Sequence, residues 1–256
     1  IKETTLPFSD PEKIRLVAPY EVEGSIPFAL GEALFDAISL NEHEGSTRAL
    51  VAAMRTSTYA EYAEAFTYAE FSPDRVTLDL VELIPLARHL AQVNHDGVSI
   101  LCDIGAQSSR IVSIANKSVR LIRTIPRGTN HIAQSFEGGS AENAIPQELL
   151  FTLDAARLGR MPTECVMHLS GLAAEENTFA ETLAQATGIT VERVSPRKIF
   201  ATSSAVQARY ITTLEAARHG TTGLSIDRVR EEDKTGTIRA HQAVVAAIIG
   251  GVSCIA

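Results

Sequence analysis

Residues 97–128 hold three strand-like segments in close succession, and this stretch constrains the fold more than any other. The first segment, GVSILCDIG, is an apolar run that predicts a buried strand ending at Asp103-Ile-Gly105. The second, SSRIVSIANKSVRLIRTIPRG, predicts two strands joined by a turn at Asn116-Lys117. A sheet with a buried strand is therefore central to any fold that this chain can adopt.

Helix-like segments alternate with further strands on both sides of this stretch. Ser9 as the N-cap, Pro11 and Glu12 predict a helix through Val22. Other helices are expected within 57–71, 145–158, 176–188 and 204–220, and other strands within 33–40, 47–55, 164–171 and 189–196. Residues 75–93 predict a short strand running into a helix. The alternation, interrupted by hairpin-like pairs, predicts an α/β fold with mixed sheets, flanking helices and two lobes.

Composition and charge narrow the class of protein. The chain has 256 residues, is 45% hydrophobic and carries a formal net charge of −8, which argues against a nucleic-acid binder and suits basic protein partners. Three widely spaced cysteines, Cys102, Cys165 and Cys254, form no metal motif and are interpreted as thiols of a reducing compartment, the first two buried.

The C-terminal segment is the least polar part of the chain. Residues 243–256, AVVAAIIGGVSCIA, carry no charge and follow the basic Lys234 and Arg239. A membrane helix needs about 20 apolar residues, so this segment predicts the start of a transmembrane helix with the basic residues on the cytoplasmic side. The alternative is a helix packed on the core, which the paired glycines Gly250-Gly251 disfavour.

Asp103 is the first candidate for binding chemistry. A carboxylate at the carboxyl end of a buried strand is where open α/β sheets place ligands. Gly105 would allow close backbone approach, Ser108 and Ser109 would donate to phosphate oxygens, and Asp103 would hold Mg²⁺. The alternative is a tight turn in which Asp103 accepts backbone N–H groups and binds nothing else.

The second candidate is the end of the strand at 164–171. Ser170-Gly171 lies between this strand and a helix, a shape that takes the base and ribose of a nucleotide. Leu172 and Ala173 follow, where a well-adapted loop would carry further glycines. His168 is interpreted as a core residue of the strand, not as a metal ligand.

Several long stretches resemble one family. LPFSDPEKIRLVAPYEVEGSIPFALGEALFD, VTLDLVELIPLARHLAQ, ILCDIGAQSSRIVSIANKSVRLIRTIPRG and CVMHLSGLAAEENTFAETLAQATGITVERVSP are similar, in this order, to the cytoplasmic region of GspL. GspL is the inner-membrane platform protein of type II secretion, and PilM, of type IV pilus assembly, is similar as well. The resemblance covers most of residues 6–218 and depends on a pattern over length.

The resemblance implies an actin-like, ribonuclease H-like fold of two lobes. The first lobe would span residues 1–95 and the second 96–220, followed by a juxtamembrane segment at 221–242 and the transmembrane start at 243–256. Asp103-Ile-Gly105 would lie in the second phosphate loop and Ser170-Gly171-Leu172-Ala173 in the adenosine loop. The chain departs from the family at its start, in the adenosine loop, and around Glu137-Gly138, where the family has a longer helical connection.

The resemblance also implies a function. A GspL-like protein is a non-catalytic scaffold that docks the cytoplasmic secretion ATPase and couples it to the platform, on the cytoplasmic face of the inner membrane. The alternative is a PilM-like pilus component that binds ATP and Mg²⁺ in an actin-like cleft. A generic α/β protein without a secretion role is the third reading. Leu172 in the adenosine loop favours the scaffold, with weak ATP binding left open.

Partner contacts are expected in the acidic segment 12–32 of the first lobe. Glu21, Glu23 and Glu32 would meet a basic surface of the ATPase. Other expected partners are the platform proteins and the membrane, with homodimerisation left open and nucleic acid excluded.

Overall fold

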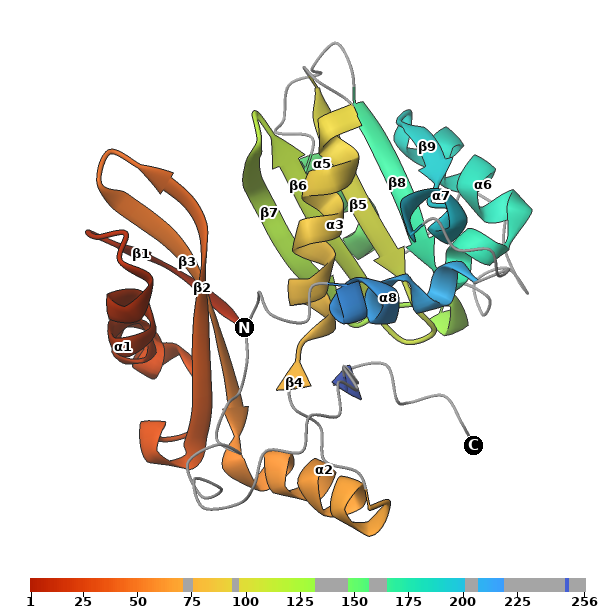
Figure 1. Cartoon of the computed structure of the whole chain (residues 1–256). Coiled ribbons are helices and arrows are strands. Elements are labelled where there is room, and N and C mark those ends of the chain that lie inside the picture. Colours follow the sequence, from red (N-terminus) through yellow and green to blue (C-terminus); the bar gives the residue numbers. More distant parts are fainter. Residues whose placement is uncertain are drawn as a thin grey trace. The chain divides into compact units, whose positions relative to one another are not determined.

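The computed structural model describes residues 1–70, 76–93, 97–131, 147–156, 165–200, 207–218 and 247–248. It divides into two compact units with a boundary between Leu78 and Asp79, whereas the sequence analysis placed the boundary after residue 95. The reason for the difference is the helix α3 (Asp79–Val93), which packs against the second sheet. The helices and the strands β1–β9 are labelled in Figure 1.

The first unit is built on a three-stranded antiparallel sheet of order β1-β3-β2. Its elements are β1 (Lys2–Leu6), α1 (Pro11–Val22), β2 (Ala33–His43), β3 (Ser46–Arg55) and α2 (Thr56–Tyr68), with the 3-10 turns η1 (Glu23–Ser25) and η2 (Leu30–Glu32) between α1 and β2. The predicted strand pair is confirmed, and its turn has both Glu44 and Gly45 at positive φ, as a tight hairpin requires.

Helix α1 covers one face of this sheet (Figure 1). Its buried side chains Ile14, Ala18 and Val22 recur every four residues, so they lie on one side of the helix and pack on the sheet. The N-cap is Asp10, whose carboxylate accepts from the backbone N–H groups of Glu12 and Lys13 at 2.9 and 3.0 Å. The prediction that Ser9 caps the helix was therefore wrong by one residue.

The C-terminal segment meets this unit in a short pair of strands. β4 (Val76–Thr77) pairs in parallel with β10 (Ala247–Ile248). These two residues are the described part of the segment 243–256, and they form a strand where the sequence predicted a helix. No helix among the described residues is long and apolar enough to cross a membrane.

The second unit contains a five-stranded mixed sheet of order β7-β6-β5-β8-β9. Its strands are β5 (Val98–Ile104), β6 (Ser109–Ala115), β7 (Ser118–Ile125), β8 (Cys165–Gly171) and β9 (Thr190–Arg193). β5, β8 and β9 run in parallel, and β6 and β7 are antiparallel to their neighbours. The predicted turn at Asn116-Lys117 is confirmed, with φ values of 51° and 61°.

Helices cover both faces of this sheet (Figure 1), which explains why all seven residues of β5 are buried. α3 packs on β5 and β6 and against α8 (Ile211–Arg218), and α5 (Gln147–Ala156) packs on the opposite face. The remaining elements are η4 (Leu172–Glu175), α6 (Asn177–Thr187), α7 (Pro196–Phe200) and η5 (Ala208–Tyr210). The predicted α/β class with a mixed sheet and flanking helices is confirmed.

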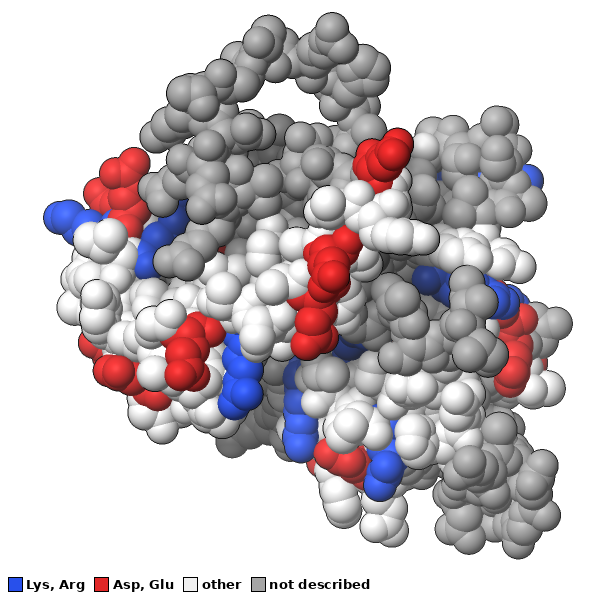
Figure 2. Space-filling model, turned by 90° about the horizontal axis from the view of Figure 1, so that it is seen from below, with Lys and Arg blue, Asp and Glu red and all other residues white. Residues whose placement is uncertain are grey.

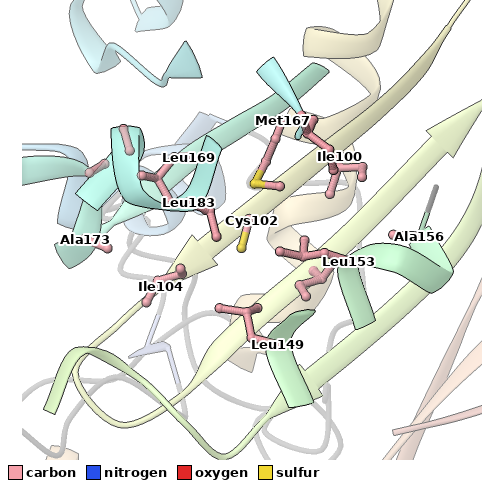
Figure 3. Packing of buried hydrophobic residues seen from close by; sticks show 14 of the residues in the cluster. Ile100, Cys102, Ile104, Leu149, Leu153, Ala156, Met167, Leu169, Ala173 and Leu183 are labelled. Carbon is pink, nitrogen blue, oxygen red and sulfur yellow. The ribbon is translucent and has the colours of Figure 1, made fainter. Parts of the chain in front are cut away.

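The main core lies between this sheet and the helices α5 and α6. Figure 3 shows the side chains of β5 pointing toward those of α5, β8 and α6. The buried residues labelled there are Ile100, Cys102, Ile104, Leu149, Leu153, Ala156, Met167, Leu169, Ala173 and Leu183. Burial raises the pKa of the Cys102 thiol, so this cysteine is an inert core residue, whereas Cys165 is only half-buried.

Candidate functional site

The sheet register brings Asp103 and Ser170 side by side. β5 and β8 are parallel neighbours, and Asp103 pairs with Ser170 and Ile104 with Gly171. The Ser170 hydroxyl donates to Asp103 Oδ2 at 2.7 Å, and the two residues are 0% and 4% exposed. The structure therefore joins two residues that the sequence assigned to separate loops, at the carboxyl ends of two central strands.

A third strand supplies a cation that sequence reasoning missed. Arg110 of β6 lies opposite Asp103 across the β5–β6 hairpin, and its guanidinium donates to Asp103 Oδ1 at 3.4 Å. The same guanidinium forms an ion pair with the carboxylate of Asp79, at the first turn of α3. Two buried acids and one buried arginine thus form a compact charged cluster beneath α3.

This cluster sets the protonation chemistry of Asp103. Burial raises the pKa of the Asp103 carboxyl, while Arg110 and the Ser170 hydroxyl act in the opposite direction. Both carboxylate oxygens already have a partner inside the protein, and Asp79, which shares the guanidinium, raises the pKa of Asp103 as burial does. Asp103 therefore has the environment of a structural acid.

The loop after Asp103 turns its polar groups inward. The Gly105 N–H donates to the Ser108 carbonyl at 3.0 Å, and the Ser109 hydroxyl, 1% exposed, donates to the Arg127 carbonyl at 2.7 Å. The carbonyls of Gly105 and Ala106 accept from Thr129 and Asn130, each at 2.9 Å. Ser108 is partly exposed.

Two glycines are needed for close backbone approach around this loop. A Cβ on Gly128 would lie 2.3 Å from the Gly105 carbonyl oxygen, so only glycine fits between the loop and the segment after β7. A Cβ on Gly171, which has φ +79°, would lie 2.6 Å from the Ile104 carbonyl oxygen. Both glycines allow the close packing of backbone segments. A ligand-binding role was predicted for Gly171 from the sequence.

The observed groups do not fit Mg²⁺ and a nucleotide phosphate. The guanidinium of Arg110, 3.4 Å from Asp103 Oδ1, would repel a cation there, and the Ser109 hydroxyl already donates its proton to the Arg127 carbonyl. Across the described residues, no cluster of three or more His, Cys, Asp or Glu could hold a metal ion. His168, interpreted as a core residue, is 7% exposed in β8, and its burial lowers the pKa of its imidazole.

The expected partner contacts lie in the first unit. Glu21 is in α1, Glu23 in η1 and Glu32 in η2, and all three side chains are exposed. In the view of Figure 2, acidic and basic side chains of the described residues are interspersed, without a broad field of one sign. Glu21, Glu23 and Glu32 are thus accessible to a partner.

Comparisons with known proteins bear on the fold. No family model and no curated protein matches this chain. A solved structure described as the PilM–PilN type IV pilus biogenesis complex is 23% identical, with a TM-score of 0.68 over 86% of this chain and 76% of that chain.

Weaker similarities are found to other solved structures. The cytoplasmic domain of EpsL, an inner-membrane component of the type II secretion system of Vibrio cholerae, is 10% identical with a TM-score of 0.43, over 88% of this chain and 72% of that one. A Bacteroides thetaiotaomicron protein of unknown function, described as having an actin-like ATPase fold, is 12% identical with a TM-score of 0.44, over 76% and 65%. The prediction from sequence is confirmed at the level of the fold: this chain has the actin-like fold found in the PilM–PilN complex.

Proposed function

We propose that this chain is a non-catalytic scaffold of a bacterial type II secretion or type IV pilus machine. In this role it docks the cytoplasmic ATPase and connects it to platform proteins at the cytoplasmic face of the inner membrane. The observation that supports the proposal is that the Asp103 carboxylate is buried and bound by other side chains of the protein. The acid that would hold metal in a nucleotide-binding actin-like protein is here 4% exposed and bound by Ser170 and Arg110.

The alternative of a PilM-like pilus component is supported in one respect and opposed in another. The similarity to the PilM–PilN structure favours a pilus machine over a secretion machine. The Arg110–Asp103 pair opposes the ATP-binding part of that alternative, because a guanidinium beside Asp103 would repel a metal cation. We therefore propose no cofactor, and we equate the two units with the two actin-like lobes.

Membrane attachment remains part of the proposal. The segment 243–256 is the candidate for a direct anchor, although Ala247 and Ile248 lie in the strand β10. A PilM-like protein would instead reach the membrane through a platform partner. A homodimer is compatible with either arrangement.

The ATPase-docking role is tested by charge reversal. We expect the triple variant Glu21→Lys, Glu23→Lys, Glu32→Lys to bind the secretion or pilus ATPase of the same organism about tenfold more weakly or worse, because like charges would then face the partner. Surface plasmon resonance on the full-length protein at two salt concentrations measures the change.

A matched control reverses three exposed acids, Glu61 and Glu64 of α2 and Glu70 in the turn after it. This control should leave the affinity unchanged. An affinity that is unchanged in the first triple variant would show that the surface is wrong. The absence of any ATPase binding by the wild-type protein would contradict the scaffold role itself.

A further inference from the structure

Helix α1 exposes two large apolar side chains on the side opposite its core face. Leu16 is 74% exposed and Tyr20 is 69% exposed. Residues four apart on a helix are surface neighbours, so these two side chains lie next to each other. The other strongly exposed large apolar residues of the described chain are distributed over separate elements: Ile1, Tyr68, Phe151 and Tyr210.

The fold of the first unit does not use this pair. The core face of α1 consists of Ile14, Ala18 and Val22, which pack with residues of the sheet. Leu16 and Tyr20 take no part in that core cluster. Since helix α1 is apolar on two opposite sides, one side serves the fold and the other is available for a partner.

Acidic side chains frame the apolar pair. Glu12 lies four residues before Leu16, and Glu23 three residues after Tyr20, and both are exposed. Glu12, Leu16, Tyr20 and Glu23 thus form a line along the surface, the α1 stripe. The basic residues beside it are Lys13 and Arg15, and Arg15 forms an ion pair with Asp36 at 3.3 Å, so the region is acidic overall once Glu21 is included.

The charges decide what the α1 stripe can bind. A second copy in a symmetric contact would bring its acidic residues against those of the first, which is unfavourable. An anionic membrane surface would repel Glu12 and Glu23 in the same way. A protein segment with apolar side chains flanked by Lys or Arg satisfies both the apolar pair and the framing carboxylates.

We propose that the α1 stripe is the docking site for a cationic amphipathic segment of a protein partner. Leu16 and Tyr20 supply the apolar anchor, since a few central apolar or aromatic side chains carry most of the energy of an interface. Glu12 and Glu23 set the orientation of the segment through its basic residues. This inference deepens the proposed docking role and depends on it only for the identity of the partner.

Site-specific photocrosslinking tests the proposal. The full-length protein is expressed in its native cells with a photoreactive benzoylphenylalanine at Leu16, at Tyr20 or, as a control, at Tyr68 of α2, which is 92% exposed. The crosslinked peptides are then sequenced by mass spectrometry. We expect positions 16 and 20 to capture one and the same segment, apolar and net positive, and position 68 not to capture it.

Two further variants test the chemistry of the contact. Glu12→Lys combined with Glu23→Lys should reduce capture at position 16 about tenfold. Leu16→Ala should reduce capture at position 20 by a similar factor, and because alanine favours the helix, the far-ultraviolet circular dichroism should not change.

The outcomes separate this inference from the proposed function. Capture of a second copy, a lipid or an acidic segment, equal capture at Tyr68, or no capture would overturn the α1 docking site. If the captured cationic segment belongs to a protein other than the ATPase and the wild-type protein binds no ATPase, the docking site stands and the ATPase role fails. If the ATPase binds the wild-type protein but positions 16 and 20 capture no cationic segment, the ATPase role stands and the docking site fails.

Discussion

Arg110→Met is expected to destabilise the second unit by roughly 3–5 kcal/mol, because it leaves two buried carboxylates without their cation. The Arg110 side chain is 9% exposed, and its partners Asp79 and Asp103 are 12% and 5% exposed. Methionine fills much of the same volume, so the loss would come from the charge and not from a cavity. Urea unfolding followed by circular dichroism measures the effect.

The stability lost in Arg110→Met should depend on pH in a defined direction. Burial already raises the pKa of Asp103, and without Arg110 that pKa would rise further. The folded variant would then bind a proton that the unfolded chain releases, so its stability would fall as the pH rises above about 4, the ordinary pKa of Asp. The deficit should therefore be smaller at pH 5 than at pH 8.

Two comparisons isolate the buried charge. Arg123→Met removes a cation whose pair with Glu148 spans 4.0 Å and is about half exposed, and it should cost at most about 1 kcal/mol. Adding Asp103→Asn to Arg110→Met should restore part of the lost stability. Equal effects of Arg110→Met and Arg123→Met would contradict a structural role of the cluster.

Gly171→Ala is the second large effect that we expect, at roughly 3–5 kcal/mol. Gly171 has φ 79° and ψ −161°, a region of backbone conformation that is almost restricted to glycine. An added Cβ would also lie 2.6 Å from the Ile104 carbonyl oxygen and 2.9 Å from its carbon and nitrogen. β8 would have to move away from β5 at the position of the Asp103–Ser170 hydrogen bond.

Gly188→Ala is the matched control for Gly171→Ala. Gly188 ends α6 with φ 65°, but no atom lies within 4 Å of its added Cβ. Only the backbone strain remains there, about 1–2 kcal/mol. The midpoint of thermal unfolding of Gly171→Ala should be well below that of Gly188→Ala. Similar midpoints for the two variants would show that close packing of β8 on β5 is unimportant.

The sequence predicted most strands and helices because their patterns are local. The apolar run of β5 and the turn at Asn116-Lys117 placed the hairpins of the second sheet correctly. β1 (Lys2–Leu6) was not predicted, because KETTL is short, largely polar and stabilised by its pairing with β3. The boundary between the two compact units is not local either, since only tertiary packing assigns α3 to the second unit.

The candidate site was predicted in part. Asp103 and Ser170 were both identified, but their contact depends on the register of two strands that are 67 residues apart in sequence. Arg110 carried a signal that was overlooked: a charged residue near the start of the apolar run SSRIVSIA, opposite Asp103 if the turn between them is tight. Asp79 carried none, because it joins the cluster only through the packing of α3 on the sheet.

We infer that Asp103 serves the architecture of the fold and does not bind nucleotide. Isothermal titration of the full-length protein with ATP and Mg²⁺ tests this most directly, with Asp103→Ala as the paired variant. We predict no binding at micromolar concentrations for the wild-type protein and no change on substitution beyond a loss of stability. Micromolar affinity that is abolished by Asp103→Ala would contradict the account.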